Sequence, residues 1–421
     1  MKLFQPLPLA PGLELPNRVV MAPLTRNRAG EGNVPTDLMV EHYRQRASFG
    51  LIISEATPVN PEGHGYPSTP GIYTEEQIAG WRKVTDAVHE AGGRIFCQLW
   101  HCGRISHPSY QPNGKFPLAP SPIGARETQI TTADWQPVTS IVKPREMTRD
   151  DIDFTVNDFR KATANAREAG FDGVEIHGAN GYLINQFLAS NSNRRQDEYG
   201  GSPENRARFL FEVLDAATTL WPGRVGLRLS PSGGSDIDPS DAEPLYEHVL
   251  ERLNSFDLTY LHLVEPRMFS EYSLSTYGEK LSSKTWRPHF KGTIISCGGH
   301  EKESANVLLN HAQADLIAFG RYAISNPDLP ARLEQDIPLN PYDRDTFYGG
   351  DATGYTDYPT LEQAPPPPVT AELTPPESIS ENDEPTAVDL LEDENQNETE
   401  EEPSPANAEN ETESPADTPI A

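Results

Sequence analysis

Eight short apolar runs alternate with longer stretches of helical periodicity along this chain, and that alternation restricts the possible folds more than any other feature. The runs are Val19–Pro23, Leu51–Ala56, Arg94–Trp100, Gly173–His177, Val225–Ser230, Tyr260–Val264, Thr293–Cys297 and Leu316–Phe319. Such alternation is typical of βαβ units, in which successive strands run parallel. Eight units of this kind close naturally into a ring. We therefore expect the α/β fold known as the (β/α)8 or TIM barrel.

Three helical stretches between the runs are especially clear: Glu75–Ala91, Arg149–Ala169 and Pro203–Leu220. Glycines follow the first two, at residues 92–93 and 170, and glycine suits the position after a helix because it adopts a left-handed backbone at low cost. An open, doubly wound sheet is the structural rival. No GxGxxG motif follows the first run, so the sequence lacks the dinucleotide-binding loop expected of that rival.

The last part of the chain differs sharply in composition from the rest. The whole chain has 63 acidic and 34 basic residues and a net charge of -29, but residues 364–421 contain 17 of the acids and no Lys or Arg, which leaves -12 for residues 1–363. The segment after Ala364 begins with four prolines and contains no aromatic residue, so it cannot bury enough apolar surface to offset the entropy lost on ordering. We expect a barrel domain over residues 1–363 and a disordered acidic tail over 364–421.

The tail has one apolar cluster, residues 387–391 (Ala-Val-Asp-Leu-Leu), which allows a second interpretation. A short apolar segment within a disordered region can fold on binding to a partner protein. The tail is thus either a solubilising extension or a docking peptide.

Charge, hydropathy and cysteine content exclude several other classes. The acidic balance disfavours nucleic acid and anionic membranes as partners, and no apolar stretch approaches the roughly 20 residues of a membrane helix. The first residues run into Pro6 before a signal-peptide core, so we expect a cytoplasmic protein. Cys97, Cys102 and Cys297 have no CxxC spacing, and we expect reduced, packed thiols and no metal site.

Polar residues follow several of the apolar runs, at the place where parallel barrels form their active sites. The first run leads into Pro23 and Thr25, the second into Ala56, and the third contains Gln98 and Trp100. Because the carboxyl ends of the strands meet at one mouth of a barrel, we expect these side chains to lie close together.

Glycines after the last two runs indicate a phosphate site. Gly298 and Gly299 follow the seventh run, and Gly320 with Arg321 follows the eighth. Bare backbone N–H groups and a guanidinium together suit the phosphate of a cofactor. The glycine pair alone is equally consistent with a simple strand-to-helix turn, and Arg321 favours the phosphate interpretation.

The fourth run ends in three residues that suit polar catalysis. His177 and Asn180 are spaced so that two donors can converge on one oxygen atom, and Tyr182 can deliver a proton to a developing carbanion. A histidine at a strand end is otherwise often structural. Arg228, in the fifth run, is either one half of a structural ion pair or a fixed cation that stabilises negative charge on a reduced flavin.

Several motifs resemble the old yellow enzyme family in order and spacing over residues 1–362. They are Met21–Arg26, Gln98–His101, His177–Tyr182, Asn185–Leu188, Ser192–Arg195, Asp197–Ser202, Glu204–Arg206, Glu265–Arg267, Ala318–Arg321, Asn326–Leu329 and Gly354–Pro359.

This resemblance implies bound FMN, with NADPH or NADH as reductant and an electrophilic alkene as small-molecule substrate. The FMN contacts implied by family and position are Pro23, Thr25, Ala56, Gln98, Arg228, Gly298, Gly299, Gly320 and Arg321. Thr25 is expected to hydrogen-bond the flavin. His177 and Asn180 are expected to hold the substrate oxygen and Tyr182 to donate the proton. Tyr66, Trp100 and Tyr348 are expected to line the pocket, and the protein to be a monomer or homodimer.

The implied reaction is a ping-pong reduction of the C=C bond of enones, enals, maleimides or nitroalkenes, with hydride passing through the flavin N5. Reduction of nitro compounds or nitrate esters at the same site is the alternative within enzymes. The iron–sulfur branch of these reductases is disfavoured, because its cysteine cluster is absent from the sequence. Outside enzymes, the alternative is a flavoprotein whose tail serves partner docking.

Overall fold

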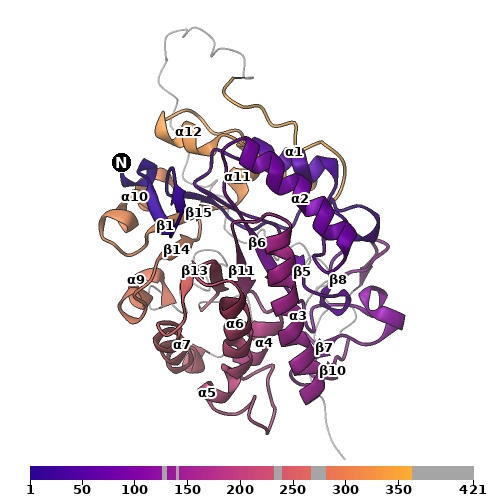
Figure 1. Cartoon of the computed structure of the whole chain (residues 1–421). Helices are drawn as coiled ribbons and strands as arrows, with labels where there is room; N and C mark the ends of the chain where they lie inside the picture. The colour runs from indigo at the N-terminus through magenta and orange to yellow at the C-terminus, as the bar shows by residue number, and fades with distance from the viewer. Residues whose placement is uncertain (126–129, 139–141, 232–238, 267–280, 363–421) are drawn as a thin grey trace, which may run out of the picture. The chain divides into compact units, whose positions relative to one another are not determined.

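The computed structural model describes residues 1–125, 130–138, 142–231, 239–266 and 281–362 (Figure 1). Arg267 of the family motif, and the predictions of a disordered tail and of a docking peptide within it, lie outside the described residues.

Eight parallel strands form a closed barrel. They are β3 (Val19–Met21), β4 (Leu51–Ile53), β6 (Ile95–Trp100), β11 (Gly173–His177), β12 (Val225–Leu229), β13 (Leu258–Val264), β14 (Ile294–Cys297) and β15 (Leu316–Phe319). Each strand pairs with the next in this order, including β6 with β11. The pairing of β15 with β3 closes the ring. The predicted TIM barrel and its eight strands are confirmed.

Helices surround the barrel, as Figure 1 shows. They are α1 (Asp37–Gln45), α2 (Glu75–Glu90), α3 (Arg149–Glu168), α4 (Leu183–Leu188), α5 (Pro203–Arg206), α6 (Arg208–Leu220), α7 (Pro239–Leu253), α9 (Ser283–Trp286), α10 (Lys302–Asn310), α11 (Arg321–Ser325) and α12 (Leu329–Glu334). Short 3₁₀ helices include η1 (Lys2–Phe4), η3 (Pro61–Gly63), η4 (Pro108–Tyr110), η5 (Pro112–Gly114) and η9 (Arg344–Thr346).

Two of the three predicted helices are confirmed, and local sequence explains their ends. Thr74 and Thr148 each form a capping box at the start of α2 and α3. Gly92 and Gly170, with φ of +84° and +88°, follow the helices as expected. The prediction of one helix over residues 203–220 is wrong. This segment is divided at Ala207 into α5 and α6, although Ala207 itself keeps a right-handed helical backbone.

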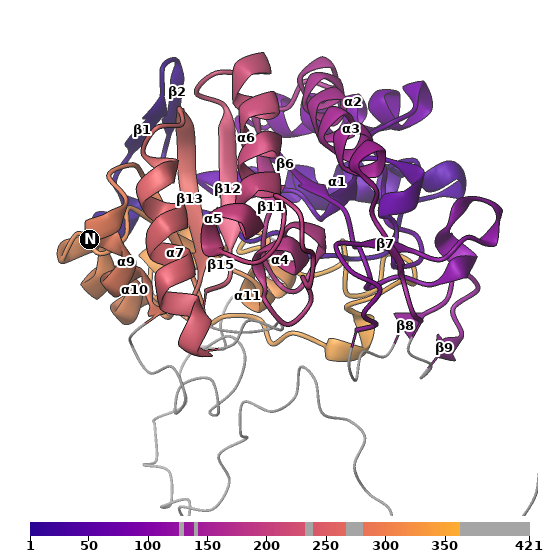
Figure 2. The same ribbon diagram turned by 90° about the horizontal axis from the view of Figure 1, so that it is seen from below.

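The amino-terminal end of the barrel is filled by a hairpin of β1 (Leu7–Ala10) and β2 (Leu13–Leu15). Leu9, Leu13 and Leu15 are buried in one apolar cluster with inward-facing residues of the barrel strands, among them Val20 and Phe96. Figure 2 shows this hairpin and the β8–β9 hairpin (Ile130–Thr131, Pro137–Val138) at opposite ends of the barrel.

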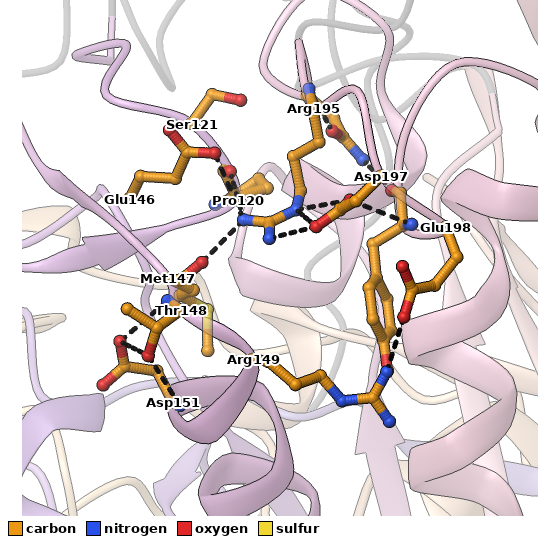
Figure 3. Close-up of polar contacts among 12 residues, drawn as sticks. Pro120, Ser121, Glu146, Met147, Thr148, Arg149, Asp151, Arg195, Asp197 and Glu198 are labelled. Carbon is orange, nitrogen blue, oxygen red and sulfur yellow. Dashed lines mark hydrogen bonds and ion pairs between the residues drawn. The ribbon is translucent and has the colours of Figure 1, made fainter.

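The β8–β9 hairpin belongs to a long excursion between β6 and α3, and Arg195 fastens both ends of that excursion to the barrel (Figure 3). Arg195 Nη1 donates to the carbonyl oxygens of Pro120 at 3.0 Å and Met147 at 2.7 Å, beside β7 (Leu118–Ala119) and β10 (Arg145–Glu146). Its Nε donates to Asp197 Oδ1 at 3.0 Å. These contacts fix the base of the excursion next to the loop that follows α4.

Candidate active site

Four aromatic rings predicted to serve catalysis or substrate binding lie together at the carboxyl end of the barrel. Trp100 stacks on Tyr66, with ring centroids 5.4 Å apart, and meets Tyr182 edge-on at 4.8 Å. His177 lies 5.1 Å from Tyr182 and 6.3 Å from Trp100. The structure therefore brings these four side chains, from three distant parts of the chain, into one wall.

The contacts of His177 define its protonation state. The Ala179 backbone N–H donates to His177 Nδ1 at 3.3 Å, so the ring proton is on Nε2. Burial, and then the charges of Arg228 and His262, lower the pKa of His177 well below its ordinary value. His177 is thus a neutral imidazole whose Nε2–H is a donor.

Asn180 is held in an uncommon backbone conformation. Its φ is +57°, a left-handed value that asparagine tolerates better than most residues, and its backbone N–H donates to Ser230 Oγ at 2.9 Å. Its Oδ1 is buried without a hydrogen-bond partner among the described residues. A buried polar atom of this kind is often explained by a water or ligand.

Tyr182 lies at the amino-terminal boundary of α4, and its hydroxyl is 3.1 Å from the hydroxyl of Tyr66. Burial, and then the neighbouring Tyr66 and Cys102, raise the pKa of Tyr182 well above its ordinary value. The phenol therefore stays protonated at neutral pH.

Gln98 and Arg228 lie deeper, inside the barrel, and are 1% and 3% exposed. Arg228 is opposite His177 in the register of β11 and β12. Its Nη2 is 3.9 Å from Cys297 Sγ, while its Nε and Nη1 have no hydrogen-bond partner among the described residues. A buried guanidinium with unpartnered N–H groups needs an acceptor, so the interpretation of Arg228 as half of a simple ion pair is not favoured.

Pro23, Thr25 and Ala56 follow β3 and β4, next to this cluster. Ala56 is buried in contact with Trp100 and Cys102, whereas Pro23 and Thr25 are partly exposed. Four residues expected to contact the cofactor phosphate follow β14 and β15, namely Gly298, Gly299, Gly320 and Arg321. Gly298 permits a close approach of two strand ends, because a Cβ there would lie 2.4 Å from Glu265 Cβ.

Arg321 is exposed, and its guanidinium rests 5.4 Å from the centroid of the Tyr342 ring, with Nη1 donating to the Tyr342 hydroxyl at 3.2 Å. Tyr348 is 61% exposed, although it lies near enough to Tyr66 and Tyr182 to contribute to the raised pKa of each. Both side chains therefore belong to the rim of the site rather than to its buried wall.

Two features at the site were given no role from the sequence. Glu175 and His262 are hydrogen-bonded inside the barrel, with Glu175 Oε2 2.8 Å from His262 Nδ1 and neither side chain exposed. Glu55, next to Ala56, is also fully buried. For Glu175 and His262 the available signal was an ionisable residue in the middle of an apolar strand, which in a barrel must face either the helices or the interior.

Two surface hollows lie elsewhere and contain none of the predicted site residues. One, of about 420 Å³, includes Asn33, His64 and Tyr110, and the other, of about 580 Å³, lies along α3 and α6. Both nitrogens of His64 already have partners, in Thr69 and Tyr73. The first hollow therefore offers no unpartnered imidazole for catalysis.

Within the described residues, no cluster of three or more His, Cys, Asp or Glu side chains is arranged to hold a metal ion. No helix among them has the length and apolarity needed to cross a membrane.

The barrel, its buried unpartnered arginine and the glycines after β14 and β15 fit a flavin nucleotide, which carries an acceptor-rich ring edge and a phosphate. Comparison with known proteins defines the class. The profile of the NADH:flavin oxidoreductase / NADH oxidase family matches residues 2–340. This chain belongs to that family, and the resemblance to the old yellow enzymes is confirmed. It is an FMN-dependent NAD(P)H oxidoreductase.

Individual relatives agree with this assignment. The chain is 48% identical over 356 residues to 12-oxophytodienoate reductase 1 of Oryza sativa subsp. japonica, covering 83% of this chain and 91% of the relative. It is 45% identical over 356 residues to 12-oxophytodienoate reductase 2 of Arabidopsis thaliana, covering 83% and 93%. Among solved structures, a variant of morphinone reductase in complex with tetrahydroNAD aligns with a TM-score of 0.80 and 46% identity, over 86% of this chain and 98% of that one.

Proposed function

We propose that this enzyme uses NADPH or NADH to reduce the C=C bond of alkenes activated by a carbonyl or nitro group. The observation that carries the proposal is that the neutral imidazole of His177 lies 5.1 Å from the protonated phenol ring of Tyr182 at the carboxyl end of the barrel, with Asn180 between them in the chain. This set suits a substrate that gains negative charge on one oxygen and a proton on a nearby carbon.

In this proposal, Gln98 and Arg228 would hold the pyrimidine edge of FMN, and Pro23, Thr25 and Ala56 would contact its ring. Gly298, Gly299, Gly320 and Arg321 would hold its phosphate. When bound, FMN supplies two-electron redox chemistry between the nicotinamide and the alkene.

His177 and Asn180 bind the carbonyl or nitro oxygen of the substrate. The His177 Nε2–H and the Asn180 side-chain amide each donate a hydrogen bond to it. Reduction of the conjugated bond builds enolate-like charge on that oxygen, so fixed donors stabilise the transition state more than the ground state. Both donors are neutral, and their strength therefore depends on preorganisation rather than on charge.

Tyr182 donates the proton to the carbon next to the activating group. Its raised pKa keeps the phenol protonated until a base as strong as a carbanion forms. The Tyr66 hydroxyl, 3.1 Å away, holds the Tyr182 hydroxyl in place. Trp100 and Tyr66 shape the wall beside the substrate, and Tyr348 covers it from the rim.

The relatives named 12-oxophytodienoate reductase and morphinone reductase support the proposal, because both are named as reductases of small organic molecules. Anaerobic stopped-flow absorbance tests it. FMN-loaded protein is mixed first with NADPH and then with 2-cyclohexenone. We expect the flavin band to bleach with NADPH and to recover with the enone.

The Tyr182→Phe variant should bleach at the normal rate but recover about 10²- to 10⁴-fold more slowly, which is the usual contribution of a general acid. Tyr73→Phe is the matched control, because the Tyr73 hydroxyl lies 3.0 Å from His64 Nε2 and Tyr73 lines the separate hollow of about 420 Å³. Recovery with a nitrate ester but not with the enone would favour the nitro-compound or nitrate-ester alternative. Bleaching that oxygen alone reverses would contradict both.

A further inference from the structure

A polar cluster lies inside the barrel below the proposed position of FMN. It comprises Glu175 on β11, Gln98 on β6, Arg228 on β12, and Tyr260 and His262 on β13, and none of these side chains is more than 3% exposed. The strand register places Glu175 opposite Gln98 and Arg228 opposite His262. Four strands therefore contribute to one buried unit.

Glu175 is the centre of this cluster. Gln98 Nε2 donates to its Oε1 at 2.7 Å, and His262 Nδ1 donates to its Oε2 at 2.8 Å. Burial alone would raise the pKa of Glu175, but His262, Arg228 and Gln98 outweigh burial, and the net pKa lies below the ordinary value. Burial lowers the pKa of His262. We take the pair as a carboxylate with a neutral imidazole, because a proton on His262 would add a second cation beside Arg228.

A fully buried carboxylate is costly, and a barrel interior filled with apolar side chains would be at least as stable. The positions of its two partners indicate a use for it. Because one N–H of the Gln98 amide points at Glu175, the amide cannot rotate freely, and its carbonyl oxygen points away from the carboxylate. Gln98 thus offers a fixed acceptor to a ligand.

The charge of Glu175 has a second effect. Arg228 lies close enough to lower the pKa of Glu175, and by the same interaction Glu175 partly offsets the positive charge of Arg228. A reduced flavin carries more negative charge than an oxidised one at neutral pH, so a weaker positive potential disfavours the reduced form.

We propose that Glu175 is a positioning residue of the cofactor site, which orients Gln98 and offsets Arg228 and so sets the affinity of the protein for oxidised relative to reduced FMN. This inference rests on the proposed placement of FMN over Gln98 and Arg228. Glu175 itself has no contact with the cofactor in this arrangement.

The test is the dissociation constant of the apoprotein for oxidised and for reduced FMN, together with the midpoint potential of the holoprotein. In Glu175→Gln the new amide can accept from Gln98 or from His262 but not from both, and the negative charge is lost. We expect oxidised FMN to bind more weakly relative to reduced FMN by roughly tenfold. A tenfold change corresponds to a potential about 30 mV higher for a two-electron couple.

Two further variants separate orientation from charge. Glu175→Asp keeps the charge but is one methylene too short to hold Gln98, so oxidised FMN should bind more weakly with less change in potential. Glu175→Gln in a Gln98→Leu background should cause no further loss of affinity for oxidised FMN. Asp241→Asn is the control, because Asp241 pairs with the buried Arg206 at 2.6 Å in the contact between α5 and α7, away from the site.

The outcomes distinguish the inference from the placement on which it rests. If Gln98→Leu and Arg228→Met change the FMN affinities while Glu175→Gln and Glu175→Asp keep the wild-type ratio and potential, the inference about Glu175 is overturned. If none of the four variants changes either dissociation constant, the placement of FMN is wrong as well. If Asp241→Asn shifts the potential as much as Glu175→Gln, the effect is not specific to this cluster and the inference fails.

Discussion

The benzene ring of the Trp135 indole lies directly over the α-carbon of Gly349. A Cβ built at residue 349 would be 2.6 Å from Cη2 of Trp135, closer than real Cβ contacts allow. Trp135 is at the turn of the β8–β9 hairpin, 42% exposed and with φ of +63°, and Gly349 follows Tyr348 on the rim of the site. Two segments more than 200 residues apart thus meet next to Tyr348.

We expect Gly349→Ala to displace Trp135 and with it the rim at Tyr348, and so to change the KM for bulky cyclic enones more than for small ones. Gly350→Ala is the matched control. It has a similar φ, +83° against +69°, and hence a similar backbone strain of about 1–2 kcal/mol, but its Cβ would meet only Arg28, at 3.7 Å. Equal effects of the two variants on KM would show that the Trp135 contact has no role in selectivity.

The pH dependence of stability should report Glu55. Burial raises the pKa of Glu55 to about 7, from an ordinary value of 4.5. Between these two pH values the folded protein retains a proton that the unfolded chain has released, so the free energy of unfolding falls as pH rises through this window, by at most about 3 kcal/mol, and is level above it.

Chemical denaturation of wild type and Glu55→Gln from pH 4.5 to 8 measures this contribution. As pH rises, the free energy of unfolding of Glu55→Gln should increase relative to that of the wild type, because glutamine has no proton to lose. A constant difference across that range would mean that Glu55 titrates normally.

The KM for the substrate, by contrast, should not change with pH near the ordinary pKa of histidine. Since the pKa of His177 is far below 6.5, the imidazole remains neutral from pH 6 to 8. The KM for 2-cyclohexenone is therefore expected to be flat over this range in the wild type. An inflection near pH 6.5 that disappears in His177→Asn would contradict the neutral-donor assignment.

The Arg195 contacts should matter for stability far more than the neighbouring surface ion pairs (Figure 3). Arg195 is buried and donates to two carbonyl oxygens and to Asp197. Hydrogen bonds from a buried charged group typically contribute about 1.5–3 kcal/mol, and we expect Arg195→Ala to lower the free energy of unfolding by about that amount.

Arg149→Ala provides the comparison. Arg149 donates to Glu198 at 2.7 Å, but both side chains are about half exposed, so its loss should lower the free energy of unfolding much less than the loss of Arg195. Limited proteolysis within the excursion should also accelerate in Arg195→Ala only. Equal destabilisation by the two variants would show that the excursion is held by other contacts.

The barrel was predictable because each apolar run is short and bounded by turn residues, and the pairing of β15 with β3 that closes the ring follows once eight strands are counted. The division between α5 and α6 was not, because Ala207 is a good helix former and only tertiary contacts of Arg206 distinguish the two segments.

The wall of the site was predictable in its members but not in its contacts. His177, Asn180 and Tyr182 lie within one short motif, yet the tautomer of His177 depends on the Ala179 N–H and the hydroxyl contact of Tyr182 on a residue 116 positions away. Glu175 was overlooked because alternation along a strand does not say which face of a barrel is the interior. Trp135 was overlooked because a turn residue has no periodicity at all.

Arg195 holds the excursion through the main-chain oxygens of Pro120 and Met147, which any amino acid presents, and through one ion pair with the half-exposed Glu146. Apart from Glu146, the side chains between those two anchor points can therefore be exchanged, or their number altered, without loss of these contacts. This gives the fold an interchangeable module that can diverge while the barrel below stays the same.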